Sequence, residues 1–231
     1  MAIVTKGFRC GVTASYDNSD SYESRVEELG HINPSLEFWL FNNASSIDNA
    51  LIVGAGFGLS SKQLINGGAT VTSIEPSSSR FSLLESNAPT STNINKMCGS
   101  SSGTAVLNFF SDNKSGGSMN SGFGDASETV DVITVDSLDL TLDLMLVYAN
   151  GREIDVLDGA VDTIANNPGM KIILRWEPDK IENIQSAIAS LNSLNKTIKI
   201  IHWEKVGDVI SYKDTDDTIL EAVITADLLL E

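Results

Sequence analysis

Three closely spaced glycines mark the first place where the chain could bind a ligand. Residues 51–58 read LIVGAGFG, an apolar run that passes directly into a glycine turn. Without Cβ atoms, such a turn lets backbone N–H groups and a helix N-terminus approach a ligand closely. Position 59, where a dinucleotide fingerprint needs a small residue, is leucine, so the pattern disfavours NAD. The residues expected to hold a ligand here are Gly54, Ala55, Gly56 and Gly58.

A single carboxylate, Glu75, follows the next β-branched run, TVTSI, at 75 − 54 = 21 residues beyond the first glycine. In a parallel sheet this position lies beside the glycine turn, where a carboxylate accepts hydrogen bonds from the hydroxyls of a ribose. The turn and the carboxylate together predict a site for a nucleoside-containing cofactor. The alternative is a glycine turn that serves only the fold.

The elements that must position these residues alternate between strand and helix from residue 50 onward. Strands are expected at 50–53, 70–74, 94–98, 105–110, 130–135, 142–148 and 171–176, and helices at 59–66, 79–87, 153–164 and 179–194. This alternation is typical of an α/β fold, a doubly wound, Rossmann-like and mostly parallel sheet with helices on both faces. Three β-rich runs without intervening helices predict an antiparallel C-terminal edge, at 197–203, 209–212 and 219–224.

Two segments fall outside this alternation. Residues 111–128 are rich in Ser, Gly and Asn and predict a long loop. Residues 1–49 contain two helix starts: Asp20 with Glu23 in capping-box spacing, for a helix over 20–29, and Asn33 before a proline. We therefore expect an N-terminal helical extension over 1–49, which is either a lid or packing at the sheet edge. The cofactor-binding domain is expected over 50–231.

The chain resembles the FkbM-type S-adenosylmethionine-dependent methyltransferases of class I over about residues 50–177. The resemblance is carried by the glycine loop and by the stretches IEPSSSRFSLLESN, CGSSSGTAVLNFFSDNKSGGS, VDVITVDSL and LDLMLVYANGREIDVLDGA. It implies a seven-stranded sheet, S-adenosylmethionine held by the glycine loop, and O-methylation as the reaction.

Charged residues typical of that family are missing from this chain. Ile52 stands where the family has an aspartate before the glycines. The family's strand end carries lysine, aspartate and glutamate, and here these positions are Leu146, Tyr148 and Asn150. Two functions therefore stay open. One is methylation of a small, hydroxyl-bearing acceptor; the other is a catalytically degenerate protein that binds the cofactor or a partner.

Methyl transfer to a hydroxyl needs an aligned acceptor and benefits from a base. Tyr148 and Asn150 are placed to orient an acceptor but are poor bases near neutral pH. Glu177, after the run KIILRW, is the better candidate for a base, with a helix-flanking charge as the alternative. Met97 and Cys98 end another predicted strand and supply either an apolar floor for adenine or core packing.

The overall charge narrows the choice of partner. Fifteen Lys and Arg against 31 Asp and Glu leave a net charge of −16, which disfavours nucleic acid and anionic membranes. A small-molecule acceptor, or a cationic partner, is easier to accommodate. Two cysteines and two isolated histidines lack metal-ligand spacing, so no metal site is expected. Neither a signal peptide nor a membrane span is apparent, which indicates a cytoplasmic location.

Overall fold

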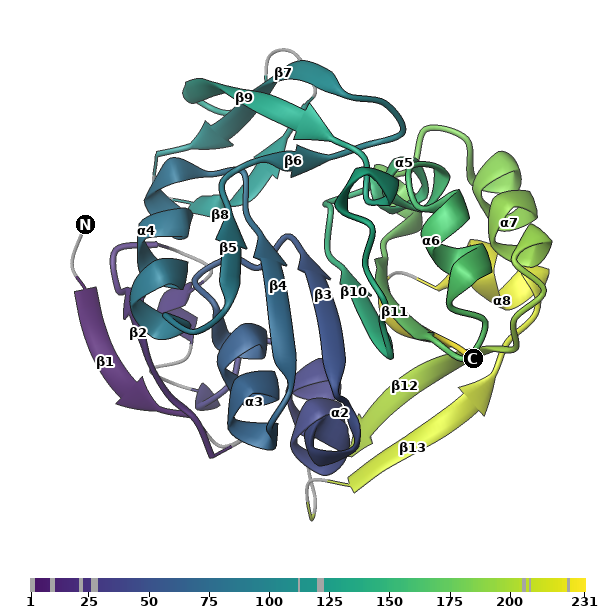
Figure 1. Cartoon of the computed structure of the whole chain (residues 1–231), viewed down its shortest axis with the longest axis horizontal. Helices are drawn as coiled ribbons and strands as arrows, with labels where there is room; N and C mark the ends of the chain where they lie inside the picture. Colours follow the sequence, from purple (N-terminus) through teal and green to yellow (C-terminus); the bar gives the residue numbers. More distant parts are fainter. Residues whose placement is uncertain are drawn as a thin grey trace.

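Eight strands pair into one central sheet in the computed structural model (Figure 1), which describes residues 3–8, 11–20, 23–25, 29–111, 113–119, 123–204, 207, 209–223 and 225–231. The strands are β3 (Asn49–Val53), β4 (Thr70–Ile74), β5 (Thr92–Ile94), β10 (Leu144–Val147), β11 (Lys171–Trp176), β12 (Ile198–Glu204), β13 (Val209–Asp214) and β14 (Ala226–Leu230). Their order across the sheet is β13-β12-β14-β11-β10-β3-β4-β5.

The sheet is parallel from β11 to β5 and antiparallel at the other edge, where β14 opposes both β11 and β12, and β13 opposes β12. This confirms the predicted α/β sheet with an antiparallel C-terminal edge, although it has eight strands instead of the seven that the resemblance implied. The chain moves outward from β3 to β4 and β5, then returns to β10 and β11 on the other side. The reversal between β3 and β10 is a topological switch point, where open α/β sheets bind ligands.

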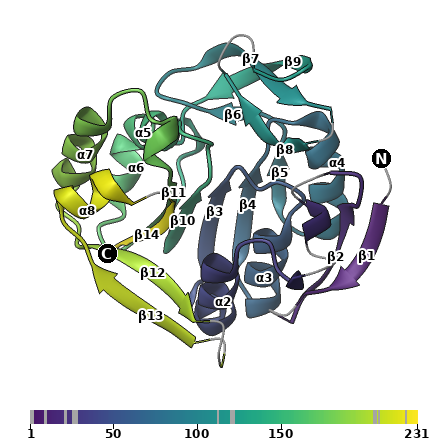
Figure 2. The same cartoon turned by 180° about the vertical axis from the view of Figure 1, so that it is seen from behind.

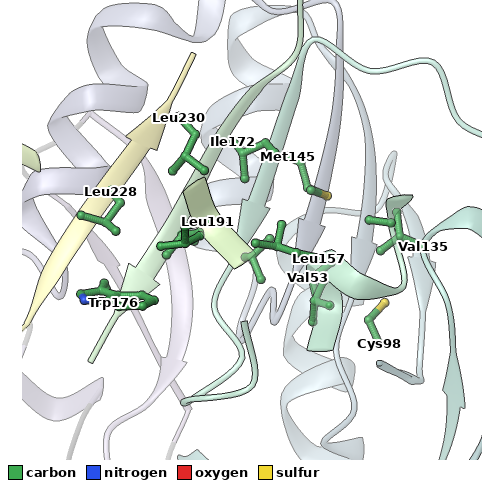
Figure 3. Close-up of a cluster of buried hydrophobic side chains, with 14 of the residues drawn as sticks. Val53, Cys98, Val135, Met145, Leu157, Ile172, Trp176, Leu191, Leu228 and Leu230 are labelled. Carbon is green, nitrogen blue, oxygen red and sulfur yellow. The ribbon is translucent and has the colours of Figure 1, made fainter. Parts of the chain in front are cut away.

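Helices cover both faces of the sheet, because its central strands are apolar on both sides. One face carries α2 (Pro34–Asn43), α3 (Leu59–Gly67) and α4 (Ser78–Asn87); the other carries α5 (Glu153–Asp158), α6 (Val161–Asn166), α7 (Ile184–Ser193) and α8 (Asp217–Ala222). Figure 3 shows the core on the second face, in which Leu157 and Leu191 of the helices join Met145, Ile172 and Leu228 of the strands.

A second sheet lies beyond the carboxyl ends of β3 and β4 (Figures 1 and 2). Its strands are β6 (Met97–Cys98), β7 (Gly103–Phe110), β8 (Asn113–Ser118) and β9 (Ala126–Ile133), in the order β6-β9-β7-β8. The loop predicted over 111–128 is therefore wrong for most of its described residues, which pair with β7. The strand predicted over 94–98 is divided, because β5 belongs to the central sheet and β6 pairs with β9.

The N-terminal part differs from the predicted helical extension. It begins with an antiparallel hairpin of β1 (Ile3–Gly7) and β2 (Thr13–Asp17). The helix predicted over 20–29 lies partly outside the described residues, and the structure has a 3-10 turn at Glu23–Arg25 within it. The predicted helix start at Asn33 is confirmed, since the Asn33 side chain accepts a hydrogen bond from the N–H of Leu36 in the first turn of α2.

Two helices of the second half are shorter than predicted. The helix expected over 153–164 is divided into α5 and α6 at Gly159, where a Cβ atom would lie 2.1 Å from a backbone carbonyl oxygen. The helix expected from residue 179 begins later, in α7, whose cap is Asn183; a 3-10 turn, Pro178–Lys180, occupies the intervening chain.

The strand predicted over 219–224 is wrong. Its described residues belong to α8 or follow it, Asp216 caps this helix by accepting the N–H of Ile219, and Ile224 lies outside the described residues. Short apolar runs do not separate strand from helix by their periodicity, and here the cap and the burial of Leu220 favour the helix. The antiparallel edge strand is the next segment, β14.

Candidate functional site

A cavity of about 350 Å³ opens at the carboxyl ends of the central strands and is bounded on one side by the second sheet. This volume lies in the lower part of the range for ligand pockets. Its walls come from the loops after β3, β4, β10 and β11, from the start of α2, and from β6, β7 and β8. The cavity brings together nine residues proposed from the sequence: Gly54, Ala55, Gly56, Glu75, Met97, Cys98, Tyr148, Asn150 and Glu177.

The glycine loop passes very close to the end of β10. A Cβ atom at Gly54, where φ is +78°, would lie 2.0 Å from the carbonyl oxygen of Tyr148, so only glycine fits. The Gly54 and Ala55 N–H groups donate to the carbonyl oxygen of Ile74, at 2.9 and 3.0 Å, which ties the loop to the end of β4. At Gly56, where φ is +57°, a Cβ atom would meet nothing within 4 Å. The loop therefore presents open space to the cavity at Gly56.

Gly58 has a different role from the one predicted. It does not line the cavity, and a Cβ atom there would lie 2.9 Å from a side-chain carbon of Leu84 and 3.5 Å from the Cβ of Asn87, both on α4. Its φ of +91° also favours glycine. Gly58 thus allows α4 to pack against the loop, and it positions the site without facing it.

Glu75 joins the two loops that follow β3 and β4. Its Oε2 accepts the N–H of Gly56 at 2.8 Å, and its Oε1 accepts the N–H of Ser77 at 2.9 Å. Burial raises the pKa of Glu75 to about 7, against the opposing effects of these two N–H groups and of Arg80. Because a carboxylate offers about four lone-pair positions, each oxygen can still accept another donor from the cavity.

The sequence left open whether Met97 and Cys98 face a ligand or pack in the core, and the structure places both at the cavity wall. Both line the cavity from β6, and Cys98 also belongs to the large apolar cluster shown in Figure 3. Burial raises the pKa of the Cys98 thiol to about 12, so it is a neutral side chain at physiological pH. This part of the wall is therefore uncharged and unreactive.

The hydroxyl of Tyr148 is held in a partly buried network centred on Asp227. It donates to Asp227 Oδ1 at 2.7 Å and accepts from Asn33 Nδ2 at 3.0 Å. Arg175 Nη1 donates to the same Asp227 oxygen at 3.1 Å, and Asp227 is only 2% exposed. The sequence did not reveal this network, because its members come from distant parts of the chain: the cap of α2, the residue after β10, and strands β11 and β14. The only local signals were the Asn–Pro helix start and one arginine in an apolar strand.

Asn150 occupies the turn after β10 with a φ of +51°, and its side chain donates to the carbonyl oxygen of Gly117 in β8 at 3.1 Å. Glu153 organises the same turn by accepting the N–H groups of Ala149 at 2.8 Å and Gly151 at 3.0 Å. Burial raises the pKa of Glu153 to about 7, and the nearby Glu177 adds to the rise. Asn150 thus connects the central sheet to the second sheet above the cavity.

Glu177 reaches the cavity from the end of β11. Its carboxylate pairs with the Lys180 ammonium group at 2.8 Å, and its side chain is 16% exposed. Of the three residues proposed for catalysis, it is the one whose side chain can act as a carboxylate base.

No group of three or more His, Cys, Asp or Glu side chains within the described chain is arranged to hold a metal ion. No described helix is both long and apolar enough to cross a membrane.

Comparison with known proteins gives structural matches alone, since no family model and no curated protein matches the chain. A S-adenosylmethionine-dependent methyltransferase from Agrobacterium tumefaciens has a TM-score of 0.51 at 12% identity, over 100% of this chain and 70% of that one. Precorrin-6Y C5,15-methyltransferase from Geobacter metallireducens GS-15 has a TM-score of 0.44 at 10% identity, over 85% of this chain and 83% of that one. Magnesium protoporphyrin IX methyltransferase from Synechocystis PCC 6803, with bound S-adenosylmethionine, has a TM-score of 0.45 at 11% identity, over 84% of this chain and 75% of that one.

Identities this low establish the fold and nothing finer. The match that spans the whole chain shows that the protein has the Rossmann-like fold of the class I S-adenosylmethionine-dependent methyltransferases. Its glycine loop and Glu75 lie at the switch point of that fold, beside the cavity.

Proposed function

We propose that this protein is a S-adenosylmethionine-dependent methyltransferase that acts on a hydroxyl group of a small acceptor, as a divergent relative of the FkbM type. The observation that carries the proposal is the junction of Gly56 and Glu75. Gly56 donates to the carboxylate at 2.8 Å, and the space in front of Gly56 is open where any other residue would place a side chain. A concave backbone turn beside a buried carboxylate suits a nucleoside.

The residues around this junction fit the cofactor. The unused lone pairs of Glu75 would accept the ribose hydroxyls, and the open space at Gly56 would admit the amino-acid part. The uncharged wall at Met97 and Cys98 suits adenine. When bound, S-adenosylmethionine supplies a methyl group on a sulfonium centre.

The acceptor side has separate tasks for its residues. Glu177 would take the proton of the attacking hydroxyl, a step that requires it to exchange its pairing with Lys180 for the acceptor. The ring of Tyr148 would form a fixed wall, because its hydroxyl is already bonded to Asp227. Asn150 would hold the turn against the second sheet.

Calorimetric titration with S-adenosylhomocysteine tests the cofactor site. Gly56→Val should weaken binding at least about tenfold, because the new side chain fills the open space. Gly68→Val is the matched control: Gly68 also has a positive φ, +105°, and open space, but it ends α3 and does not line the cavity. Equal affinity in both variants would remove the proposal.

A protein that binds the cofactor without using it is the second candidate. It is favoured by the bonds that occupy both acceptor-side groups, the Tyr148 hydroxyl on Asp227 and the Glu177 carboxylate on Lys180. The two candidate functions are distinguished by incubating the protein with S-adenosylmethionine and a mixture of small hydroxyl compounds. Methylated products are then detected by mass spectrometry. Binding with no methylated product in any mixture would select the second candidate. Turnover that Glu177→Gln abolishes, while binding persists, would select the first.

A further inference from the structure

Basic side chains are concentrated in the lining of the cavity, although the whole chain is acidic. The chain has 15 basic and 31 acidic residues. Among the described residues that line the cavity, the basic ones outnumber the acidic ones: Arg80, Lys96, Arg152, Arg175 and Lys180 against Glu37, Glu75 and Glu177. One third of all basic residues therefore surround a single cavity. Each of the five is paired with a carboxylate: Arg80 with Asp20 and Glu23, Lys96 with Asp131, Arg152 with Asp155, Arg175 with Asp227, and Lys180 with Glu177. A ligand anion must therefore exchange with one of these carboxylates, and the exposed pairs are the ones that allow it.

Three of these cations gather on the acceptor side. Arg152 follows the turn after β10, Arg175 lies in β11, and Lys180 ends the 3-10 turn after β11. The two loops touch, since a Cβ atom at Gly151 would lie 2.7 Å from the carbonyl oxygen of Lys180. The glycine loop and Glu75 occupy the neighbouring strand ends, so this cluster is built from different loops than the cofactor site.

The present partners of two of these cations leave room for exchange. Arg152 pairs through Nε with Asp155, and Lys180 pairs with Glu177. The side chains of Arg152 and Lys180 are 49% and 43% exposed, and an ion pair in such a place contributes little to stability. A guanidinium has five N–H donors, so a pairing through Nε leaves its terminal nitrogens for a second carboxylate.

We propose that the acceptor carries a carboxylate group, which Arg152 and Lys180 bind at the mouth of the cavity. Binding of this group to Lys180 would also release Glu177 from its ion pair, so that the base becomes available when the acceptor is present. Leu107 and Met119, from the second sheet and the residue after it, line the same cavity and suit an apolar acceptor body. The substrate class is therefore a small hydroxy acid. This inference rests on the proposed function.

The test uses three hydroxy acids, salicylate, mandelate and lactate, and their neutral primary amides. Each is titrated into protein saturated with S-adenosylhomocysteine, and binding is followed by ligand-observed NMR. At least one acid should bind about tenfold more tightly than its amide, and added salt should reduce the difference. Arg152→Gln and Lys180→Gln should each weaken binding of that acid about fivefold or more. Lys213→Gln, which removes an exposed charge from β13 at the far edge of the sheet, should leave it unchanged.

The outcomes separate this inference from the proposed function. If Arg152→Gln and Lys180→Gln weaken S-adenosylhomocysteine and not the acid, these cations serve the carboxylate of the cofactor and the inference is overturned. The inference is also overturned if no acid binds better than its amide. It is overturned, too, if neutral acceptors are methylated with the same efficiency as acids, although the methyltransferase proposal then stands. If an acid binds through both residues but is never methylated, the anion site stands and the proposed reaction fails.

Discussion

Lowering the pH from about 8 to about 5.5 should weaken cofactor binding through a single group, Glu75. Burial raises the pKa of this carboxyl to about 7, so without ligand it gains its proton within this range. Ribose hydroxyls donate hydrogen bonds, and they favour the charged carboxylate over the protonated form. Binding should therefore lower the pKa of Glu75, and the affinity should rise with pH until Glu75 is fully ionised.

The magnitude follows from the same pKa. A pH of about 5.5 lies roughly 1.5 units below a pKa of about 7, so the affinity for S-adenosylhomocysteine should fall about thirtyfold, or about 2 kcal/mol. Above about pH 8 the affinity should level off, because the carboxyl is then ionised before the ligand binds. Near pH 7, binding should release about half a proton.

Calorimetric titrations between about pH 5.5 and about pH 8, in two buffers that differ in ionisation enthalpy, measure both the affinity and the number of protons released on binding. Glu75→Gln should bind weakly at all pH values, because the amide resembles the protonated acid. Glu153→Gln is the matched control: Glu153 has a similar pKa of about 7 but does not line the cavity, so the pH dependence should persist. A flat profile in the wild type, or an equal slope in Glu75→Gln, would refute the assignment of Glu75 to the ribose.

Three further outcomes are expected. The folded protein holds the protons of Glu75 and Glu153 more tightly than the unfolded chain does, because both pKa values are raised to about 7. The free energy of unfolding should therefore fall as the pH rises from 4.5 through about 7. Urea denaturation in that pH range should show this fall, and the fall should be smaller in Glu153→Gln. Tyr148→Phe removes a donor from the buried Asp227 and should cost about 1–3 kcal/mol of stability while S-adenosylhomocysteine affinity stays within about twofold; a loss of affinity without a loss of stability would contradict this. Gly54→Ala should destabilise the protein by about 3 kcal/mol in thermal unfolding, since its Cβ would lie 2.0 Å from the carbonyl oxygen of Tyr148; normal stability would mean that the loop does not pass there.

The second sheet shows why composition misled the prediction for residues 111–128. A segment rich in Ser, Gly and Asn has low β-propensity, yet β8 pairs with β7, and β7 with β9. A Cβ atom at Gly117 would lie 2.8 Å from a methyl carbon of Leu107, so a larger residue would require the Leu107 side chain to move. The glycine that resembled a loop signal in the sequence is thus a strand residue in close contact with the neighbouring strand.

The acidic composition was similarly incomplete as a guide to the ligand. A net charge of −16 argues against polyanions as partners, because it describes the long-range field of the whole molecule. It says nothing about which residues the fold collects in one place. Arg152 and Lys180 are separated by β11 and two helices in the chain, and they meet at the cavity only because β10 and β11 are adjacent and parallel.

The sequence by itself determined the glycine loop, the position of Glu75 and the alternation that builds the parallel sheet. These features depend on short-range spacing: one residue between glycines, and one strand and helix between loop and carboxylate, which adjacent parallel strands bring to the same edge. The surroundings of Tyr148 were decided only by the tertiary structure. Its hydroxyl partners, Asn33 and Asp227, are 115 and 79 residues away in the chain, and no local pattern couples such distant positions until the sheet and α2 have packed together.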